Sequence, residues 1–192
     1  MEPDQTILER LNLAAGGYVL AVSSINPHKN FKLVVASMAL LKDSGLSLVI
    51  AGGVNPRVFS GSGADFPANV KYAGYVSDGE LKALYSGALC FVYPSLYEGF
   101  GLPPLEAMAC GCPVVVSDRA SLPEVCGAAA VYVDPGSAAG LVAAIEKIHS
   151  DPEVRRAMAE TGRARAALFT WRRTAESLLA VCLEAAGFKA VK

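Results

Sequence analysis

The chain has 192 residues, a length that suits one domain with a substantial core and leaves no room for a second full domain. Its formal net charge is -1, from 17 basic and 18 acidic side chains without a basic cluster, which argues against nucleic acid as a partner. Hydrophobic residues make up 53% of the chain, yet no apolar run reaches the roughly 18 residues that a membrane span needs.

Six short apolar runs, rich in β-branched and aromatic residues, predict strands that are buried on both faces of a parallel sheet. They cover Tyr18–Val22, Leu46–Ala51, Val70–Ala73, Leu89–Tyr93, Pro113–Ser117 and Ala130–Val133. Helical patterns separate most of these strands, at Phe31–Asp43, Asp78–Gly87, Pro103–Cys110 and Ser137–Ser150, with Ser77 and Ser137 as expected N-caps. The alternation predicts an α/β fold with a doubly wound parallel sheet of about six strands.

Two segments fall outside this alternation. Val54 to Ala68 is rich in Gly, Pro, Ser and Asn and predicts one long loop. After Asp151-Pro152 the pattern is helical to about Ala186, with a break near Phe169-Thr170-Trp171. We expect a single domain over residues 1–192, with an α/β core at about 16–169 and a C-terminal helix at 170–187.

The cysteines predict neither disulfides nor a metal site. They are odd in number and lie in apolar contexts, so reduced core thiols are expected at Cys90, Cys110, Cys112, Cys126 and Cys182. Cys110 and Cys112 alone cannot complete a tetrahedral site, because no further Cys or His stands nearby in the sequence. The first residues lack the positive and apolar regions of a signal peptide, so a cytoplasmic location is expected.

The most informative segment is Pro94–Glu106, in which seven residues around a glycine-rich turn separate Glu98 from Glu106. The turn follows a predicted strand and leads into a helix that has two prolines at its start. Ligands of open α/β sheets collect at the carboxyl ends of the strands, and a helix N-terminus attracts anions. The segment therefore predicts a site for a ligand that carries phosphate.

The run from Glu98 to Glu106 matches the E-x7-E motif of retaining glycosyltransferases of the GT-B fold, and the chain resembles family GT4, glycosyltransferase group 1. Four further segments resemble that family: Tyr18–Asn30 (first strand and phosphate loop), Gly74–Tyr85 (nucleotide edge), Ala109–Asp118 and Leu122–Val125. The likeness extends from about Tyr18 to the last helix. It covers only the Rossmann-like C-terminal domain, which binds the donor in that family.

The resemblance implies a site for a nucleoside diphosphate sugar, with no metal or cofactor. Lys29 and Glu98 would be the catalytic residues, with Lys29 on the diphosphate and Glu98 facing the sugar and the reacting centre. Glu106 would accept hydrogen bonds from the ribose hydroxyls. The other implied donor-binding residues are Ser23, Ser24, His28, Gly52, Gly53, Tyr75, Val76, Gly99, Phe100, Gly101 and Leu102.

The family often carries an arginine at the position of Ser24, and some members instead carry it at the position of His28, so both arginine options are absent from this chain. This departure leaves open how the diphosphate charge is neutralised. Simpler explanations also stay open for single residues: Lys29 as an exposed lysine at a helix start, Glu98 as a carboxylate that stabilises a helix N-terminus, and the glycine pairs as ordinary turns.

The implied activity is the transfer of a hexose to an acceptor, which would be a glycan, a lipid or a small molecule. Mannose from GDP-mannose is favoured because Asn26–Asn30 resembles mannosyltransferase-like members, while UDP- and dTDP-sugars stay open. The alternatives are a non-catalytic nucleotide-sugar-binding module and a GT-B-fold nucleotide-sugar epimerase. The epimerase is disfavoured because that group lacks this E-x7-E run.

The last helix is expected to expose an apolar face. In the family this helix crosses to the N-terminal, acceptor-binding domain, to which nothing in this chain corresponds. Part of the face would then be exposed, or used in self-association, and peripheral membrane association through the absent domain stays open. The face would consist of Trp171, Ala175, Leu178, Leu179 and Cys182.

Overall fold

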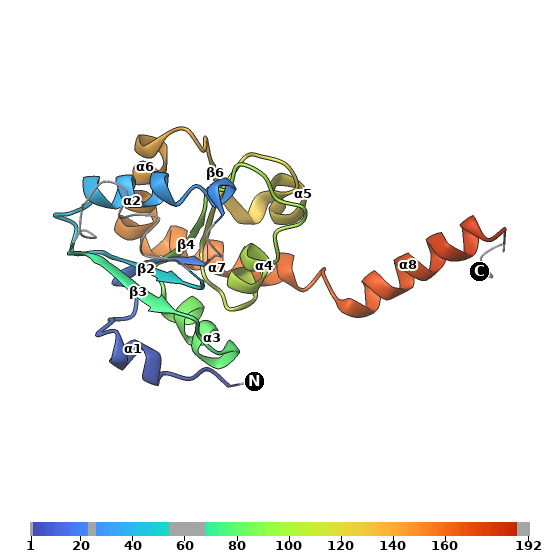
Figure 1. Cartoon of the computed structure of the whole chain (residues 1–192), viewed down its shortest axis with the longest axis horizontal. Helices are drawn as coiled ribbons and strands as arrows, with labels where there is room; N and C mark the ends of the chain where they lie inside the picture. The colour runs from blue at the N-terminus through green and yellow to red at the C-terminus, as the bar shows by residue number, and fades with distance from the viewer. Residues whose placement is uncertain (1, 23–25, 54–67, 188–192) are drawn as a thin grey trace.

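The computed structural model describes residues 2–22, 26–53 and 68–187. Its six strands form one parallel sheet in the order β3-β2-β1-β4-β5-β6 (Figure 1). The strands are β1 (Tyr18–Val22), β2 (Ser47–Ala51), β3 (Val70–Gly74), β4 (Cys90–Tyr93), β5 (Val114–Ser117) and β6 (Ala130–Val133). Each lies within one residue of a predicted strand, and the doubly wound parallel sheet is confirmed.

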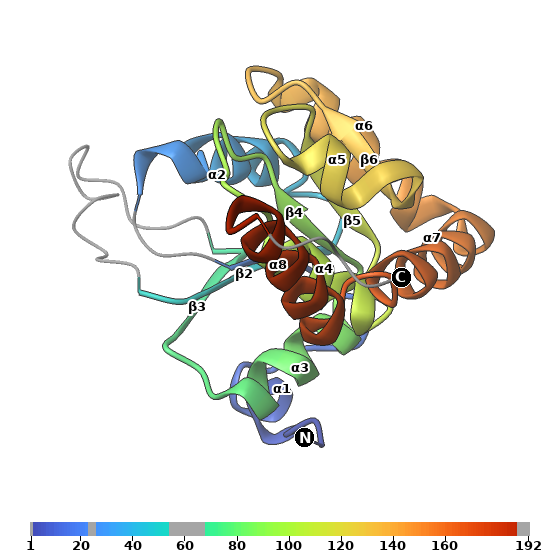
Figure 2. The same cartoon turned by 90° about the vertical axis from the view of Figure 1, so that its right-hand side faces the viewer.

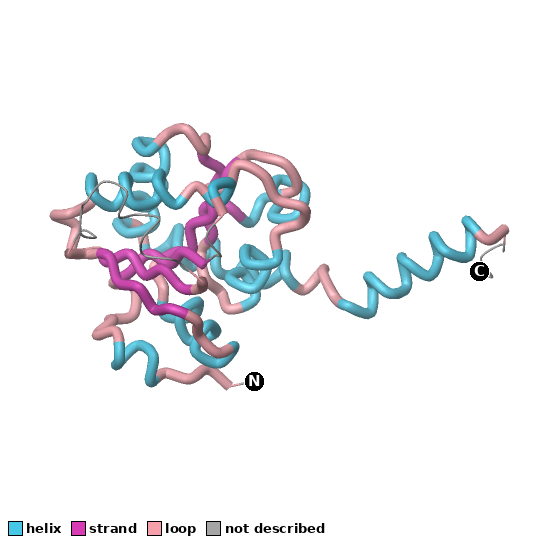
Figure 3. The backbone as a smooth tube through the Cα atoms, viewed as in Figure 1, coloured by secondary structure: helices cyan, strands magenta, loops and turns pink. Residues whose placement is uncertain are grey.

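Helices cover both faces of the sheet, as the secondary-structure colouring makes clear (Figure 3). α2 and α6 pack on one face, and α1, α3, α4 and α5 pack on the other (Figure 2). The helices are α1 (Thr6–Arg10), η1 (Pro27–Lys29), α2 (Phe31–Leu40), α3 (Asp78–Gly87), α4 (Leu102–Ala109), α5 (Leu122–Cys126), η4 (Gly127–Ala129), α6 (Ala138–Ser150), α7 (Pro152–Ala166) and α8 (Trp171–Ala185).

The predicted helix ends are largely correct. Ser77 caps α3 with a full capping box, and the Ser137 hydroxyl accepts the Gly140 N–H at the start of α6. α2 ends at Leu40 instead of Asp43, because the chain turns there toward β2 through Gly45, whose φ is +76°. The sequence did not predict α1 and α5, which have five residues each and are too short for a helical period to stand out.

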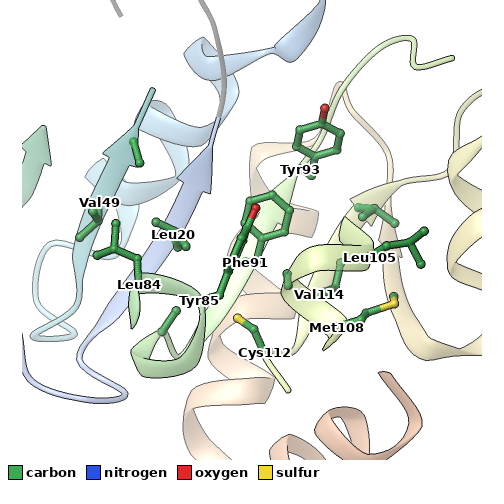
Figure 4. Packing of buried hydrophobic residues seen from close by; sticks show 14 of the residues in the cluster. Leu20, Val49, Leu84, Tyr85, Phe91, Tyr93, Leu105, Met108, Cys112 and Val114 are labelled. Atoms are coloured by element: carbon green, nitrogen blue, oxygen red, sulfur yellow. The ribbon is translucent and has the colours of Figure 1, made fainter. Parts of the chain in front are cut away.

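An aromatic stack runs through the core toward the carboxyl edge of the sheet. The Phe91 ring on β4 lies edge-on to Tyr85 of α3, with centroids 5.4 Å apart, and stacks on Tyr93 at 5.6 Å (Figure 4). Phe91 is completely buried, and such aromatic pairs add to the free energy gained from burial. The stack therefore holds Tyr93 firmly at the end of β4.

The cysteine prediction is right for three residues and wrong for one. Cys90, Cys112 and Cys126 are buried, and burial raises the pKa of the Cys126 thiol to about 11. Cys110 is partly buried, whereas Cys182 is exposed on α8 and is not a core thiol. No group of three His, Cys, Asp or Glu side chains lies close enough to hold a metal within the described ranges.

The last helix projects from the body of the domain (Figure 1). Trp171, Leu178 and Leu179 of α8 have 82%, 62% and 59% of their surface exposed, and Ala175 and Cys182 are exposed as well. The prediction of an exposed apolar face is therefore confirmed, and its packing on another domain stays a prediction.

Across the part of the chain that the structure describes, no helix is long and apolar enough to cross a membrane. The predicted loop from Val54 lies outside the described residues except for Ala68.

Candidate active site

The candidate site lies where the carboxyl ends of β1 and β4 meet. These strands are neighbours in the sheet although they are not consecutive in the chain, so the connections on their two sides run in opposite directions. The crevice at such a position is where open α/β sheets bind ligands. η1, which follows β1, carries Lys29, and the turn after β4 carries Glu98.

The structure brings together the two residues that were predicted to be catalytic. Lys29 Nζ lies 2.6 Å from Glu98 Oε1 and 2.6 Å from the Tyr93 hydroxyl, and it also lies 4.9 Å from the centroid of the Tyr93 ring. The Lys29 and Glu98 side chains are only 16% and 10% exposed. Lys29 is therefore not a freely exposed lysine at a helix start, and a positive charge is held firmly at the sheet edge.

Opposing effects set the pKa of Glu98. Burial by itself would raise this pKa, but the hydrogen bond from Lys29 and the nearby hydroxyls of Ser95 and Tyr93 outweigh burial and lower it. Ser95 Oγ is fully buried and forms no hydrogen bond of good geometry to a described residue, so we attribute the lowered pKa chiefly to Lys29. Burial and then the Glu98 carboxylate raise the pKa of Tyr93, which keeps its hydroxyl neutral.

The lowered pKa of Glu98 predicts that this residue stabilises the fold at neutral pH and loses that effect at acidic pH. A carboxylate whose pKa is lower in the folded chain stabilises fully above its unfolded pKa of about 4.3, and the contribution is lost as pH falls through the folded pKa. We expect the thermal unfolding midpoint to fall more steeply below about pH 5 in the wild type than in Glu98→Gln. Glu160→Gln, an exposed carboxylate of α7, is the control and should keep the wild-type slope. Equal slopes for wild type and Glu98→Gln would contradict the prediction.

Contacts from distant segments hold the glycine turn in place. The Ser121 hydroxyl lies 3.0 Å from the Glu98 carbonyl oxygen and 2.6 Å from that of Phe100, so it can donate to either. The Phe100 ring lies edge-on to Phe169, just before α8, with centroids 5.9 Å apart. Gly101 caps α4 with a φ of +115°, a conformation that favours glycine. Nothing in the sequence indicated that Ser121 and Phe169 face this turn.

The other acidic residue of the motif, Glu106, is exposed on α4, and its Oε2 lies 3.4 Å from the Tyr85 hydroxyl. Its charge is near enough to contribute to the raised pKa of Tyr93, so both acidic residues of the motif act on that side chain. An exposed carboxylate with unused oxygen lone pairs can accept hydrogen bonds from a ligand's hydroxyl groups. At the turn between the two acidic residues, Gly99, Phe100 and Leu102 are exposed.

The remaining predicted residues follow β1, β2 or β3 in the chain. Gly53 and Tyr75 lie together at the ends of β2 and β3, where a Cβ on Gly53 would meet the Tyr75 hydroxyl. Tyr75 is 88% exposed and its hydroxyl is the far end of the side chain, so it can move aside and close packing does not require glycine at position 53. Gly52 has a φ of +116°, and Val76 packs on the core. The carbonyl of His28 accepts the Leu96 N–H at 2.7 Å, and Ser23 and Ser24 lie outside the described residues.

Comparisons with known proteins agree with this architecture. Residues 7–165 match the family model for glycosyl transferases group 1. O-antigen chain mannosyltransferase B of Escherichia coli is 37% identical over 175 residues, which cover 86% of this chain and 45% of that protein. Sucrose-phosphate synthase from Thermosynechococcus elongatus is 32% identical with a TM-score of 0.82, over 97% of this chain and 50% of that one.

A more distant structural neighbour is Anabaena HepE in complex with UDP-glucose. It is 19% identical with a TM-score of 0.80, over 94% of this chain and 52% of that one, and at this identity the likeness concerns the fold alone. The chain therefore spans about half the length of these relatives.

Proposed function

This chain belongs to the glycosyl transferases group 1 family, and on that premise we propose that it is the donor-binding domain of a retaining glycosyltransferase that uses a nucleoside diphosphate sugar. The observation that carries the proposal is the ion pair of Lys29 and Glu98 at the carboxyl ends of β1 and β4. This pair supports the proposal because a positive charge that would bind a diphosphate stands beside a carboxylate that would face the sugar, at the crevice where such folds bind ligands.

Lys29, Glu98 and Glu106 then have separate roles in the proposed reaction. When the bond between the anomeric carbon and the diphosphate breaks, negative charge builds on the departing oxygens, and Lys29 stabilises it. The acceptor hydroxyl attacks the anomeric carbon from the same face, and its proton passes to the departing diphosphate. Glu98 supplies negative potential beside the positively charged sugar ring, and Glu106 binds the ribose hydroxyls.

We propose mannose from GDP-mannose as the donor. The mannosyltransferase relative at 37% identity supports mannose, and UDP- and dTDP-sugars stay the alternatives. The acceptor, the cytoplasmic location and the packing of α8 on an N-terminal domain stay predictions. A non-catalytic nucleotide-sugar-binding module is the second candidate, because Ser24 and His28 replace the family's arginines.

A calorimetric titration of this chain with GDP-mannose, UDP-glucose, UDP-N-acetylglucosamine, GDP and UDP tests the donor site. We expect ligands that share one base to bind. Glu106→Ala should weaken them by about 1–3 kcal/mol, the cost of losing hydrogen bonds to a charged group. Glu160→Ala, which removes an exposed carboxylate from α7, should bind as the wild type does. An equal effect of both variants, or no binding at millimolar ligand, would contradict the proposed donor site.

A further inference from the structure

We propose that Asn30 is a positioning residue that fixes where the Lys29 ammonium meets the diphosphate. This inference rests on the proposed function, because it concerns the same site. Asn30 directly follows Lys29, at the junction between η1 and α2. It touches neither Glu98 nor the glycine turn in any hydrogen bond found for its side chain, so its effect would act through the position of Lys29.

The backbone of Asn30 is in the left-handed region, with φ 58° and ψ 36°. This conformation lets the chain end η1 and enter α2 within one residue. Asparagine tolerates it better than most residues do, but glycine would adopt it at no cost. The backbone therefore explains a glycine or an asparagine at this position, and only the side chain distinguishes them.

The side-chain amide of Asn30 joins three loops. Its Nδ2 donates to the carbonyl oxygen of Pro94 at 3.1 Å and to that of Pro135 at 2.8 Å. Pro94 follows β4 and Pro135 follows β6, so the amide spans the sheet edge on both sides of β5. Both partners are acceptors, and only the NH₂ group, with two hydrogens, can satisfy them together.

These hydrogen bonds fix the backbone positions from which the Lys29 and Glu98 side chains extend. Pro94 stands four residues before Glu98, and the Leu96 N–H also donates to the His28 carbonyl, so the loops of Lys29 and Glu98 are joined at two points. A lysine side chain loses much rotamer freedom when its ammonium is held. Keeping its backbone at a fixed distance from the ligand reduces the freedom that remains to be lost on binding.

Asn30→Gly separates the effect of the side chain from that of the backbone, because glycine can keep the left-handed conformation while the side-chain amide is lost. We expect it to weaken the binding of GDP or UDP, whichever the chain binds, by roughly 5- to 20-fold, and by less than about 2-fold in a Lys29→Ala background. Asn30→Asp, which keeps the shape but turns a carboxylate toward two carbonyls, should weaken binding in the same direction. Asn12→Gly is the matched control: this asparagine also has a positive φ, 46°, but lies after α1.

The decisive measurement is the coupling between positions 30 and 29, which is how much the effect of Asn30→Gly on binding shrinks when Lys29 is absent. A merely structural role of Asn30 would give the same effect in both backgrounds. If Asn30→Gly binds as tightly as the wild type, or weakens binding equally with and without Lys29, the inference is overturned while the proposed function stands. If Lys29→Ala itself has no effect on the binding of either diphosphate, or neither diphosphate binds the wild type, the proposed function fails and the inference fails with it. Thermal unfolding of each variant shows that the comparison is made between folded proteins.

Discussion

Replacing Lys29 with alanine is expected to weaken nucleoside diphosphate binding by roughly 10- to 100-fold, the effect of losing hydrogen bonds to a charged group. The Lys29 ammonium is held at the crevice by Glu98 and Tyr93, with both distances 2.6 Å, so it is already placed for an anion before the ligand arrives. Calorimetry with GDP and UDP, or their sugars, measures the loss directly.

Lys32→Ala is the matched control for this experiment, because Lys32 lies one turn further along, exposed on α2. It removes the same charge from nearly the same place on the chain. If the two variants lost affinity equally, the effect would come from general electrostatic attraction, and Lys29 would have no special role.

Glu98→Gln is expected to act with opposite signs on binding and on turnover. In the ligand-free chain, Glu98 holds the Lys29 ammonium. An arriving diphosphate must therefore compete with Glu98 for it. Removing the carboxylate frees Lys29, and since a partly exposed ion pair is worth up to about 1 kcal/mol, diphosphate affinity should rise by up to roughly 5-fold. Release of diphosphate from a nucleotide sugar should become much slower, because the negative potential beside the reacting carbon is lost.

The comparison needs both measurements on one variant: affinity for GDP or UDP, and the rate of diphosphate release in a transfer assay with the complete protein. Glu160→Gln serves again as the control, since its exposed carboxylate lies on α7. If the affinity for the diphosphate and the rate of its release both fell, Glu98 would contribute to ground-state binding. An unchanged rate would remove it from the reaction.

The sheet could be predicted from the sequence because its strands are apolar on both faces. Residues such as Leu20 and Phe91 face one helical layer, while Val19 and Val92 face the other, and continuous apolar runs are the result. That Lys29 and Glu98 share one site was an expectation from the family resemblance, whereas their ion pair was not predicted, because it depends on β1 and β4 being neighbours in the sheet. Short helices such as α1 lack enough residues for a period to show.

The residues that support the site were not predictable, because their partners are far away in the chain. The Asn30 amide bonds to carbonyls 64 and 105 residues away, and Tyr93 meets Lys29 across 64 residues. Ser121 and Phe169 reach the glycine turn from the N-cap of α5 and from the segment before α8. Such contacts depend on the three-dimensional path of the loops, which hydrophobic patterns and turn residues do not specify.

A crystal structure of this chain with a nucleoside diphosphate sugar bound is the most direct test of the donor site. We expect the diphosphate within hydrogen-bonding distance of Lys29 Nζ, the ribose hydroxyls at Glu106, and the sugar beside Glu98. The present Lys29 to Glu98 contact of 2.6 Å should lengthen as the ligand takes over the ammonium. A ligand bound away from the carboxyl ends of β1 and β4, or with its diphosphate apart from Lys29, would contradict the proposed site.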